Sequence, residues 1–187
     1  MTGASGALPG GPGRRAGAAL LGAVAALSAL ACMSPARPDA MTPAPLGLAP
    51  RQVHTVNIRT TGGQATVPGG LSKISNDAFT EALAQGLLES GLLHAVVDVP
   101  GDYQLGVDII ELRQPRWAFP MSVRLMTTWH LTLRGEKRPV WRDVITTNYT
   151  VGFGAEFLGY KRLGMATEGA ARENIKQAIL RLSQQVK

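Results

Sequence analysis

The residue types that most often carry catalysis or bind metals are few in this sequence, and they are scattered. His54, His94 and His130 show no i, i+4 pairing and have no acidic residue at metal-ligand spacing, so no metal site is expected. No serine stands in a Gly-x-Ser-x-Gly turn. Asp98 and Asp102 flank a Pro-Gly turn, where aspartate is ordinary turn chemistry. The sequence therefore predicts a protein that is not an enzyme and that binds no cofactor.

Cys32 is the one residue whose position indicates a specific covalent chemistry. It is the only cysteine, and it follows an uncharged segment, Ala16–Ala31, which Arg14 and Arg15 precede. A basic flank, a short apolar run and small residues before the cleavage point are typical of a secretory signal peptide. A membrane-spanning anchor needs about 20 apolar residues, and this run is shorter. We therefore expect residues 1–31 to be a signal peptide.

The end of this segment, Ala29-Leu30-Ala31-Cys32, resembles the lipobox of bacterial lipoproteins, although the commonest form has leucine three residues before the cysteine. In that family the thiol is acylated, with palmitate among the usual chains, and cleavage makes the cysteine the N-terminus. Met33 is not the aspartate that retains lipoproteins at the inner membrane in enteric bacteria. The resemblance thus implies an outer-membrane lipoprotein that faces the periplasm. A secreted protein without lipid and a retained signal anchor are the alternatives.

The charge balance restricts the partners of the mature protein. The whole chain has a formal net charge of +6, and Arg14 and Arg15 leave with the signal peptide, so the remainder is only mildly basic. No run of basic residues appears, and an exported protein meets little nucleic acid. The expected partners are the membrane, through the lipid, and an envelope protein or lipid.

A proline- and alanine-rich segment separates the cysteine from the first periodic residues. Residues 32–50 are expected to form the lipidated cysteine and an extended tether, because they show no hydrophobic periodicity. Residues 51–187 are long enough for one domain of ordinary size. The prolines of the tether are Pro35, Pro38, Pro43, Pro45 and Pro50.

The first half of the domain reads as strand, loop and helix. Residues 52–60 alternate between apolar and polar side chains, and residues 61–70 hold four glycines and a proline, which predicts a loop. Ser75 or Asn76 can cap a helix that ends at Gly91. A short edge strand is possible within residues 94–99.

The second half contains the clearest strand signals. Alternation over residues 103–109 shifts its phase at Ile110, which predicts a bulge. Residues 121–133 alternate strictly, with His130 on the polar side, and residues 135–139 form a hairpin loop to a strand over 141–151. The expected core face of the longest strand is Val123, Leu125, Trp129, Leu131 and Leu133.

The C-terminal part completes the fold. Residues 152–164 are rich in glycine and are expected to form a loop, and residues 171–186 form an amphipathic helix. The fold class is α+β, a two-layer sandwich with a mainly antiparallel sheet of about four strands and two helices on one face, in the order β-α-β-β-β-α.

Two aromatic loops are the expected binding surface. Both should lie at the sheet edge opposite the hairpin loop, where one strand begins and the next ends. Aromatic and cationic side chains are enriched at binding surfaces, but these residues could also pack over the end of the core. The candidates are Arg116, Trp117, Phe119, Phe153, Phe157, Tyr160, Lys161 and Arg162.

Three stretches, Ala82–Leu93, Asp102–Leu105 and Met165–Ile175, resemble small envelope lipoproteins of Gram-negative bacteria. The resemblance covers nearly the whole expected domain. More loosely, the chain is similar to transport-auxiliary lipoproteins, to LptE-like lipopolysaccharide-assembly lipoproteins and to the N-terminal domain of TolB. It implies a non-catalytic, lipid-anchored accessory or assembly subunit. An envelope hydrolase and a lipid carrier are the alternatives.

Overall fold

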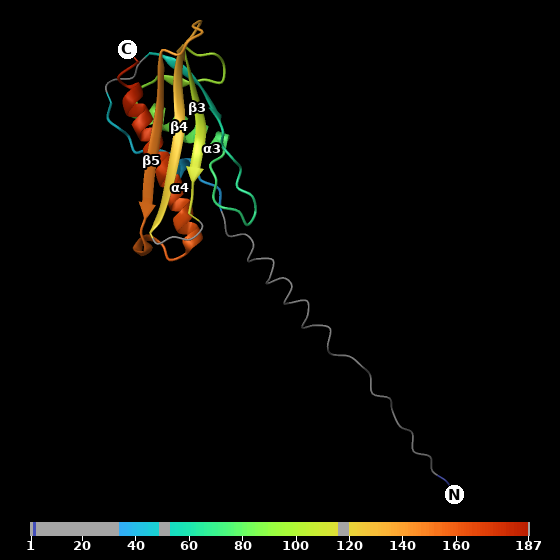
Figure 1. Ribbon diagram of the computed structural model, residues 1–187. Helices are drawn as coiled ribbons and strands as arrows, with labels where there is room; N and C mark the ends of the chain where they lie inside the picture. The colour runs from blue at the N-terminus through green and yellow to red at the C-terminus, as the bar shows by residue number, and fades with distance from the viewer. Residues whose placement is uncertain (1, 3–33, 49–52, 116–119, 187) are drawn as a thin grey trace. The chain divides into compact units, whose positions relative to one another are not determined.

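The structure is a computed structural model that describes Thr2 and residues 34–48, 53–115 and 120–186 (Figure 1). Contacts divide the chain into two units, Met1–Cys32 and Met33–Lys187, and every helix and strand named below belongs to the second unit. Cys32 and residues 116–119 lie outside the described residues. Among the residues that are described, no helix is long and apolar enough to cross a membrane.

Five strands form one sheet in the order β2-β1-β3-β4-β5. The three long strands β3, β4 and β5 are antiparallel to one another, whereas β1 is parallel to both β2 and β3. Their bounds are β1 (Thr55–Thr61), β2 (Ala95–Val96), β3 (Tyr103–Arg113), β4 (Met121–Leu133) and β5 (Trp141–Val151).

The two-layer α+β sandwich is confirmed, with two differences from the expected sheet. The short strand β2 is present and raises the number of strands to five. The chain leaves β1 through the helix α3 (Asn76–Ser90), and a helical crossover returns the chain in parallel. The strand β1 is therefore parallel to its neighbours because α3 carries the chain back across the sheet. The strands β3, β4 and β5 are antiparallel because direct connections join them one after another.

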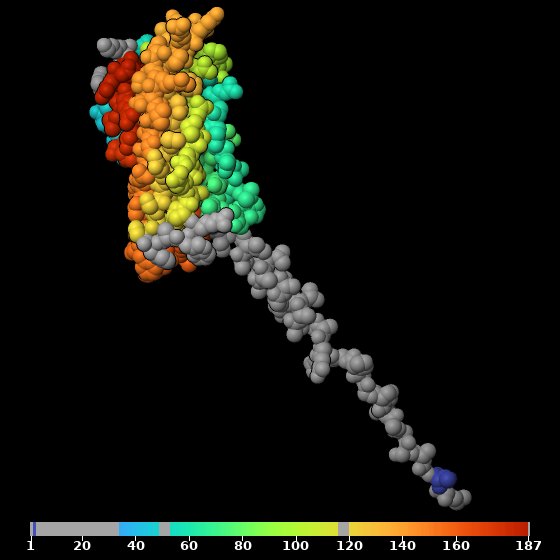
Figure 2. Space-filling view, viewed as in Figure 1, coloured from blue at the N-terminus to red at the C-terminus, as the bar shows by residue number. Residues whose placement is uncertain are grey.

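The two long helices cover one face of the sheet (Figure 1). The helix α3 packs on β1, and α4 (Gly159–Leu182) packs on β4 and β5. The start and end of α3 are as expected: the Ser75 hydroxyl accepts a 3.2 Å hydrogen bond from the amide of Ala78, and Gly91 ends the helix in the left-handed conformation. Figure 2 shows the opposite face, where side chains of β3, β4 and β5 form the surface.

The expected core face of β4 is confirmed for four of its five residues. Val123, Leu125, Trp129 and Leu131 are buried, whereas Leu133 is exposed, because it is the last residue of the strand and extends beyond the helices. The ring of Trp129 lies 6.1 Å from that of Phe79, centroid to centroid. The expected phase shift in β3 is also present, since its register to β4 shifts between Ile109 and Glu111.

The loop within the glycine-rich residues 152–164 is shorter than expected. A 3-10 turn, η2 (Phe153–Ala155), follows β5, and α4 already begins at Gly159. Gly169, further along α4, permits close packing, because a Cβ at this position would collide with the ring of Tyr149. The helix α4 can therefore approach β5 closely. Residues 159–164, which were expected to be part of the loop, form its first turns.

The segment expected to be a tether packs against the domain. It forms the short helix α2 (Pro38–Met41), and the side chain of Met41 is fully buried. Pro43 lies against Gly86 of α3, where a Cβ would meet its ring at 3.0 Å. Arg172 of α4 donates a 2.9 Å hydrogen bond to the carbonyl of Ala40. A few apolar side chains without periodicity are enough to dock this segment, which is why composition alone indicated a free linker.

Candidate functional site

The end of the sheet opposite the β4–β5 hairpin holds the described part of the expected binding surface. Met121, the first residue of β4, pairs with Val151, the last residue of β5. Figure 1 shows the end of β5 and the first turns of α4 at this same end of the domain. The expected meeting point of the two aromatic loops is thus correct for their flanking strands. Arg116, Trp117 and Phe119 themselves lie outside the described residues.

Two phenylalanines form the centre of this surface. Phe153 is 53% exposed and Phe157 is 73% exposed. Their ring centroids are 5.2 Å apart at an interplanar angle of 86°, the edge-to-face arrangement that aromatic quadrupoles favour. The two rings therefore support each other while a large part of their apolar area stays in contact with water.

Two aliphatic side chains extend this apolar area along α4. Leu158, the residue before the helix, and Met165 are both exposed. They are seven residues apart, which places them on one face of a helix. We call Phe153, Phe157, Leu158 and Met165 the end patch. Sequence reasoning had already placed Leu158 in the second aromatic loop but missed Met165, because the helix was expected to begin only at Ala171.

Arg162 has a structural role under the end patch, which corrects its expected place among exposed cations. Only 2% of the residue is exposed. Its Nη1 donates hydrogen bonds of 2.7 Å to the carbonyl of Glu156 and 3.0 Å to that of Phe157, and its guanidinium lies 5.1 Å from the centroid of Phe153. A buried charge is tolerated where such acceptors surround it. Arg162 therefore holds the turn that presents the phenylalanines.

Lys161 is the cation that remains at the surface. Its side chain is half exposed, and its Nζ lies 3.9 Å from a carboxylate oxygen of Glu156. An exposed ion pair at this distance contributes little to stability, so the lysine can exchange this partner for another anion. The neighbouring Tyr160 is half-buried, and like Lys161 it belongs to the first turn of α4 and not to a loop.

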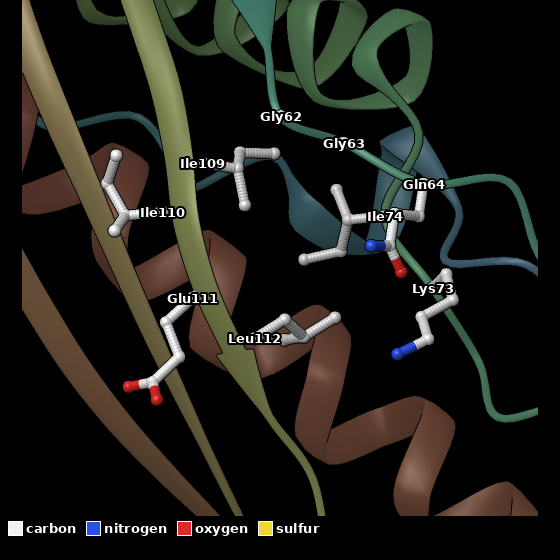
Figure 3. A pocket seen from close by; sticks show the side chains of 9 residues that line it. All are labelled: Gly62, Gly63, Gln64, Lys73, Ile74, Ile109, Ile110, Glu111 and Leu112. Atoms are coloured by element: carbon white, nitrogen blue, oxygen red, sulfur yellow. The ribbon is translucent and has the colours of Figure 1, made fainter.

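A small pocket lies where β1 leaves the side of β3 (Figure 3). Gly62, with φ +79°, turns the chain away there, and a Cβ at this position would collide with the carbonyl of Ile109. Lys73 and Glu111 are the two charged side chains of the lining. The pocket has a volume of about 140 Å³, whereas sites for small molecules typically have about 300–1,000 Å³. It is too small for a substrate of ordinary size.

Asp102 has a structural role at the turn before β3. No three His, Cys, Asp or Glu side chains among the described residues come together as metal ligands would. Asp102 accepts hydrogen bonds from the Thr55 amide at 2.8 Å and the Thr55 hydroxyl at 3.0 Å. These bonds hold the pKa of Asp102 below its usual value. This carboxylate therefore fastens the start of β1 to the turn before β3.

A buried polar network joins α4 to the sheet, and sequence reasoning missed it. Asn174 is fully buried; its Oδ1 accepts a 2.7 Å hydrogen bond from Thr127, and its Nδ2 donates one of 3.1 Å to the carbonyl of Ile145. The indole of Trp129 donates in turn to the Thr127 hydroxyl at 2.7 Å. These bonds fix the position of α4 on β4 and β5, and thereby that of the end patch.

The comparison with known proteins finds similarity in the fold. No protein-family model and no curated protein matches the sequence. A solved structure from Xanthomonas campestris, described by family DUF330, is 13% identical with a TM-score of 0.59, and the match covers 76% of this chain and 92% of that one. A hypothetical protein from Chlamydia trachomatis is 8% identical with a TM-score of 0.53, over 72% and 98% of the two chains.

A minor lipoprotein from Acinetobacter baumannii is also similar, at 10% identity and a TM-score of 0.47, over 70% of this chain and 92% of that one. At such identities the likeness extends to the fold and not to residues of a site. The first two matches show that this α+β sandwich occurs in other bacterial proteins. The likeness to LptE and to TolB stays a prediction from the sequence.

Proposed function

We propose that the protein is a lipoprotein of the Gram-negative envelope, anchored through acyl chains on Cys32. The observation that carries the proposal is the order of residues at the N-terminus: Arg14 and Arg15, then the uncharged run Ala16–Ala31, then the single cysteine. Because the chain has no other cysteine, no disulfide within it can compete for this thiol.

Replacement of the cysteine tests the anchor. Cys32→Ala removes the acylated atom, so the variant should lose label from a metabolic acyl-chain probe and accumulate as the longer precursor. Ser34→Ala, two residues further on, is the matched control and should keep both label and processing. Equal label on the wild type and on Cys32→Ala would contradict a lipid anchor at this position.

We propose the outer membrane as the location, with the domain on the periplasmic side. The support is Met33, which stands where enteric lipoproteins retained at the inner membrane have aspartate. In an enteric host, Met33→Asp should move the protein from the outer-membrane to the inner-membrane fraction of a density gradient. If the wild type already sediments with the inner membrane, the location is wrong although the anchor can be right.

We propose that the domain acts as a non-catalytic accessory or assembly subunit that binds an envelope protein or lipid. The support is the pair of exposed phenylalanines, Phe153 and Phe157, at the centre of the end patch. An envelope hydrolase needs a cleft with convergent polar groups, and a lipid carrier needs an apolar cavity between the layers. That space is filled by buried side chains such as Phe79, Leu83 and Trp129.

A photo-crosslinking residue at Phe157 tests binding at the end patch in intact cells. The matched control is the same residue at Val144, which is also exposed but lies on β5. Adducts of defined mass that form from position 157 and not from 144 would support a binding role. Equal adducts from both positions, or none from either, would contradict a binding role specific to the end patch.

A further inference from the structure

The docked N-terminal segment makes the distance between the lipid and the domain short. Ala36 is buried, and its amide donates a 3.1 Å hydrogen bond to the carbonyl of Lys73. Only four residues lead from Cys32 to Ala36, and four residues span at most about 14 Å. A free tether over residues 33–50 would instead have reached about 55 Å as extended polyproline-like chain. A headgroup layer is roughly 5–8 Å thick. The start of the domain therefore lies no further from the acyl chains than about two such layers.

The attachment point on the domain is the side of α4. Arg37 follows Ala36, and both its amide and its Nε donate to the same carboxylate oxygen of Glu168, at 3.1 Å and 3.4 Å. The carboxylate is largely buried, with 12% of the side chain exposed. The chain therefore enters the domain beside Glu168 and cannot move away from α4 without breaking this pair.

The end patch lies next to this attachment point on the same helix. Met165 precedes Glu168 by three residues, about 4.5 Å along the axis, and Leu158 precedes it by ten, about 15 Å. Leu158, Met165 and Glu168 follow the spacing of one helix face. The reach of the anchor, about 14 Å, is thus similar to the distance of about 15 Å along α4 from Glu168 to the far end of the patch at Leu158, so a bilayer that holds the acyl chains is within reach of the patch.

The chemistry of the end patch fits a lipid surface. Phe153, Phe157, Leu158 and Met165 offer exposed apolar side chains, and Lys161 between them has a half-exposed ammonium group. Apolar side chains with a lysine beside them are the composition that binds at the headgroup boundary, where the ammonium can meet lipid phosphates.

We infer that the end patch is a second membrane contact: it inserts into the headgroup boundary of the leaflet that holds Cys32, and so sets the end of the domain where α4 begins against the bilayer. This inference rests on the proposed lipid anchor. The β4–β5 hairpin, at the opposite end of the sheet, then points toward the aqueous phase and stays available to a protein partner.

Labelling at single introduced cysteines tests the contact, because the thiol of Cys32 is acylated in the anchored protein. Lys161→Cys places an environment-sensitive fluorophore beside the end patch without removing it, and Glu136→Cys places the same label in the hairpin. The mature lipoprotein is reconstituted into vesicles of phosphatidylethanolamine and phosphatidylglycerol. Brominated lipids should quench the label at 161 several-fold more than the label at 136, and aqueous iodide should show the reverse order.

A second variant keeps the test independent of the label. Phe157→Asp, in the Lys161→Cys background, places a charge in the end patch and should return the label at 161 to the iodide sensitivity of the label at 136. Equal iodide quenching at 161 and 136 in the wild-type background would overturn the membrane contact. So would a label at 161 that is protected from iodide but not quenched by the lipids, since another protein or a second copy would then cover the end patch.

Flotation of the same vesicles separates the two proposals. If the protein does not float with the lipid, the anchor fails, and the membrane contact fails with it. If the protein floats but the label at 161 behaves like that at 136, the anchor stands and only the membrane contact is wrong.

Discussion

Arg37 and Glu168 join the N-terminal segment to the C-terminal helix: the amide and the Nε of Arg37 both donate to one carboxylate oxygen of Glu168, at 3.1 Å and 3.4 Å. The two residues are 131 positions apart in the chain. Their pairing turns a segment with the composition of a linker into part of the folded domain, and it sets how far the domain can stand from its anchor.

Removing the charge of Glu168 should loosen this segment. Glu168→Gln keeps the size of the side chain but weakens both hydrogen bonds, and we expect a loss of about 1–2 kcal/mol in the free energy of unfolding. Faster amide hydrogen exchange over residues 36–41 should accompany it. Glu173→Gln on the same helix, which removes only an ion pair with Lys176 at 3.8 Å, should change exchange there little. Unchanged exchange in Glu168→Gln would show that the Arg37–Glu168 pair does not hold the segment in place.

The two faces of β4 should respond very differently to truncation. Trp129 is fully buried between sheet and helices, so Trp129→Ala should cost about 3–5 kcal/mol through the lost burial and the remaining cavity. His130 is half-exposed on the other face, and His130→Ala should change stability by less than about 0.5 kcal/mol. Similar melting temperatures for the two variants would contradict this assignment of the faces.

The buried network around Asn174 should be costly to break. Asn174→Ala removes the partner of Thr127 and of the Ile145 carbonyl, both inside the core, and leaving buried polar groups unsatisfied costs about 1–3 kcal/mol. Gln184→Ala, on an exposed residue just after α4, is the control and should stay within about 0.5 kcal/mol. Urea unfolding measures both. Equal midpoints for the two variants would mean that water replaces the amide without loss.

The contribution of Asp102 to stability should depend on pH. Hydrogen bonds from Thr55 lower the pKa of Asp102 in the folded state, and the unfolded value is about 3.9. The stabilisation is therefore fully present only well above the unfolded pKa and is lost as the pH falls through the lower, folded pKa. The difference between the urea midpoints of wild type and Asp102→Asn should be constant from neutral pH to about pH 5 and shrink below pH 4. A difference that grows on acidification would contradict this role.

Much of the fold could be predicted because local signals agree with tertiary packing. The alternation along β4, the Ser75 cap and the Gly91 stop all describe interactions within a few residues, and each is present in the structure. The meeting of β4 and β5 at one end also followed, because a hairpin fixes which strand ends are neighbours. The parallel pairing of β1 with β3 was harder to predict from the sequence, because it depends on the path of α3 across the sheet.

The docked segment and the first turns of α4 could not be predicted, because their burial depends on distant partners. Met41 is buried only because α3 and α4 stand close enough together to receive it. Gly169 reads as a helix breaker, yet it serves to bring α4 close to Tyr149. Arg162 looks like a surface cation in the sequence, and only the turn over residues 152–158 shows that its guanidinium donates to backbone carbonyls of that turn.

Mass spectrometry of the N-terminal peptide of the mature protein, purified from membranes, tests the proposed anchor most directly. A lipoprotein should give a peptide that begins at Cys32 and carries the mass of its acyl groups, and no peptide from residues 1–31 should remain. A peptide that runs from Ala31 into Cys32 with an unmodified thiol would contradict the anchor, the membrane contact of the end patch and the short distance between domain and bilayer together.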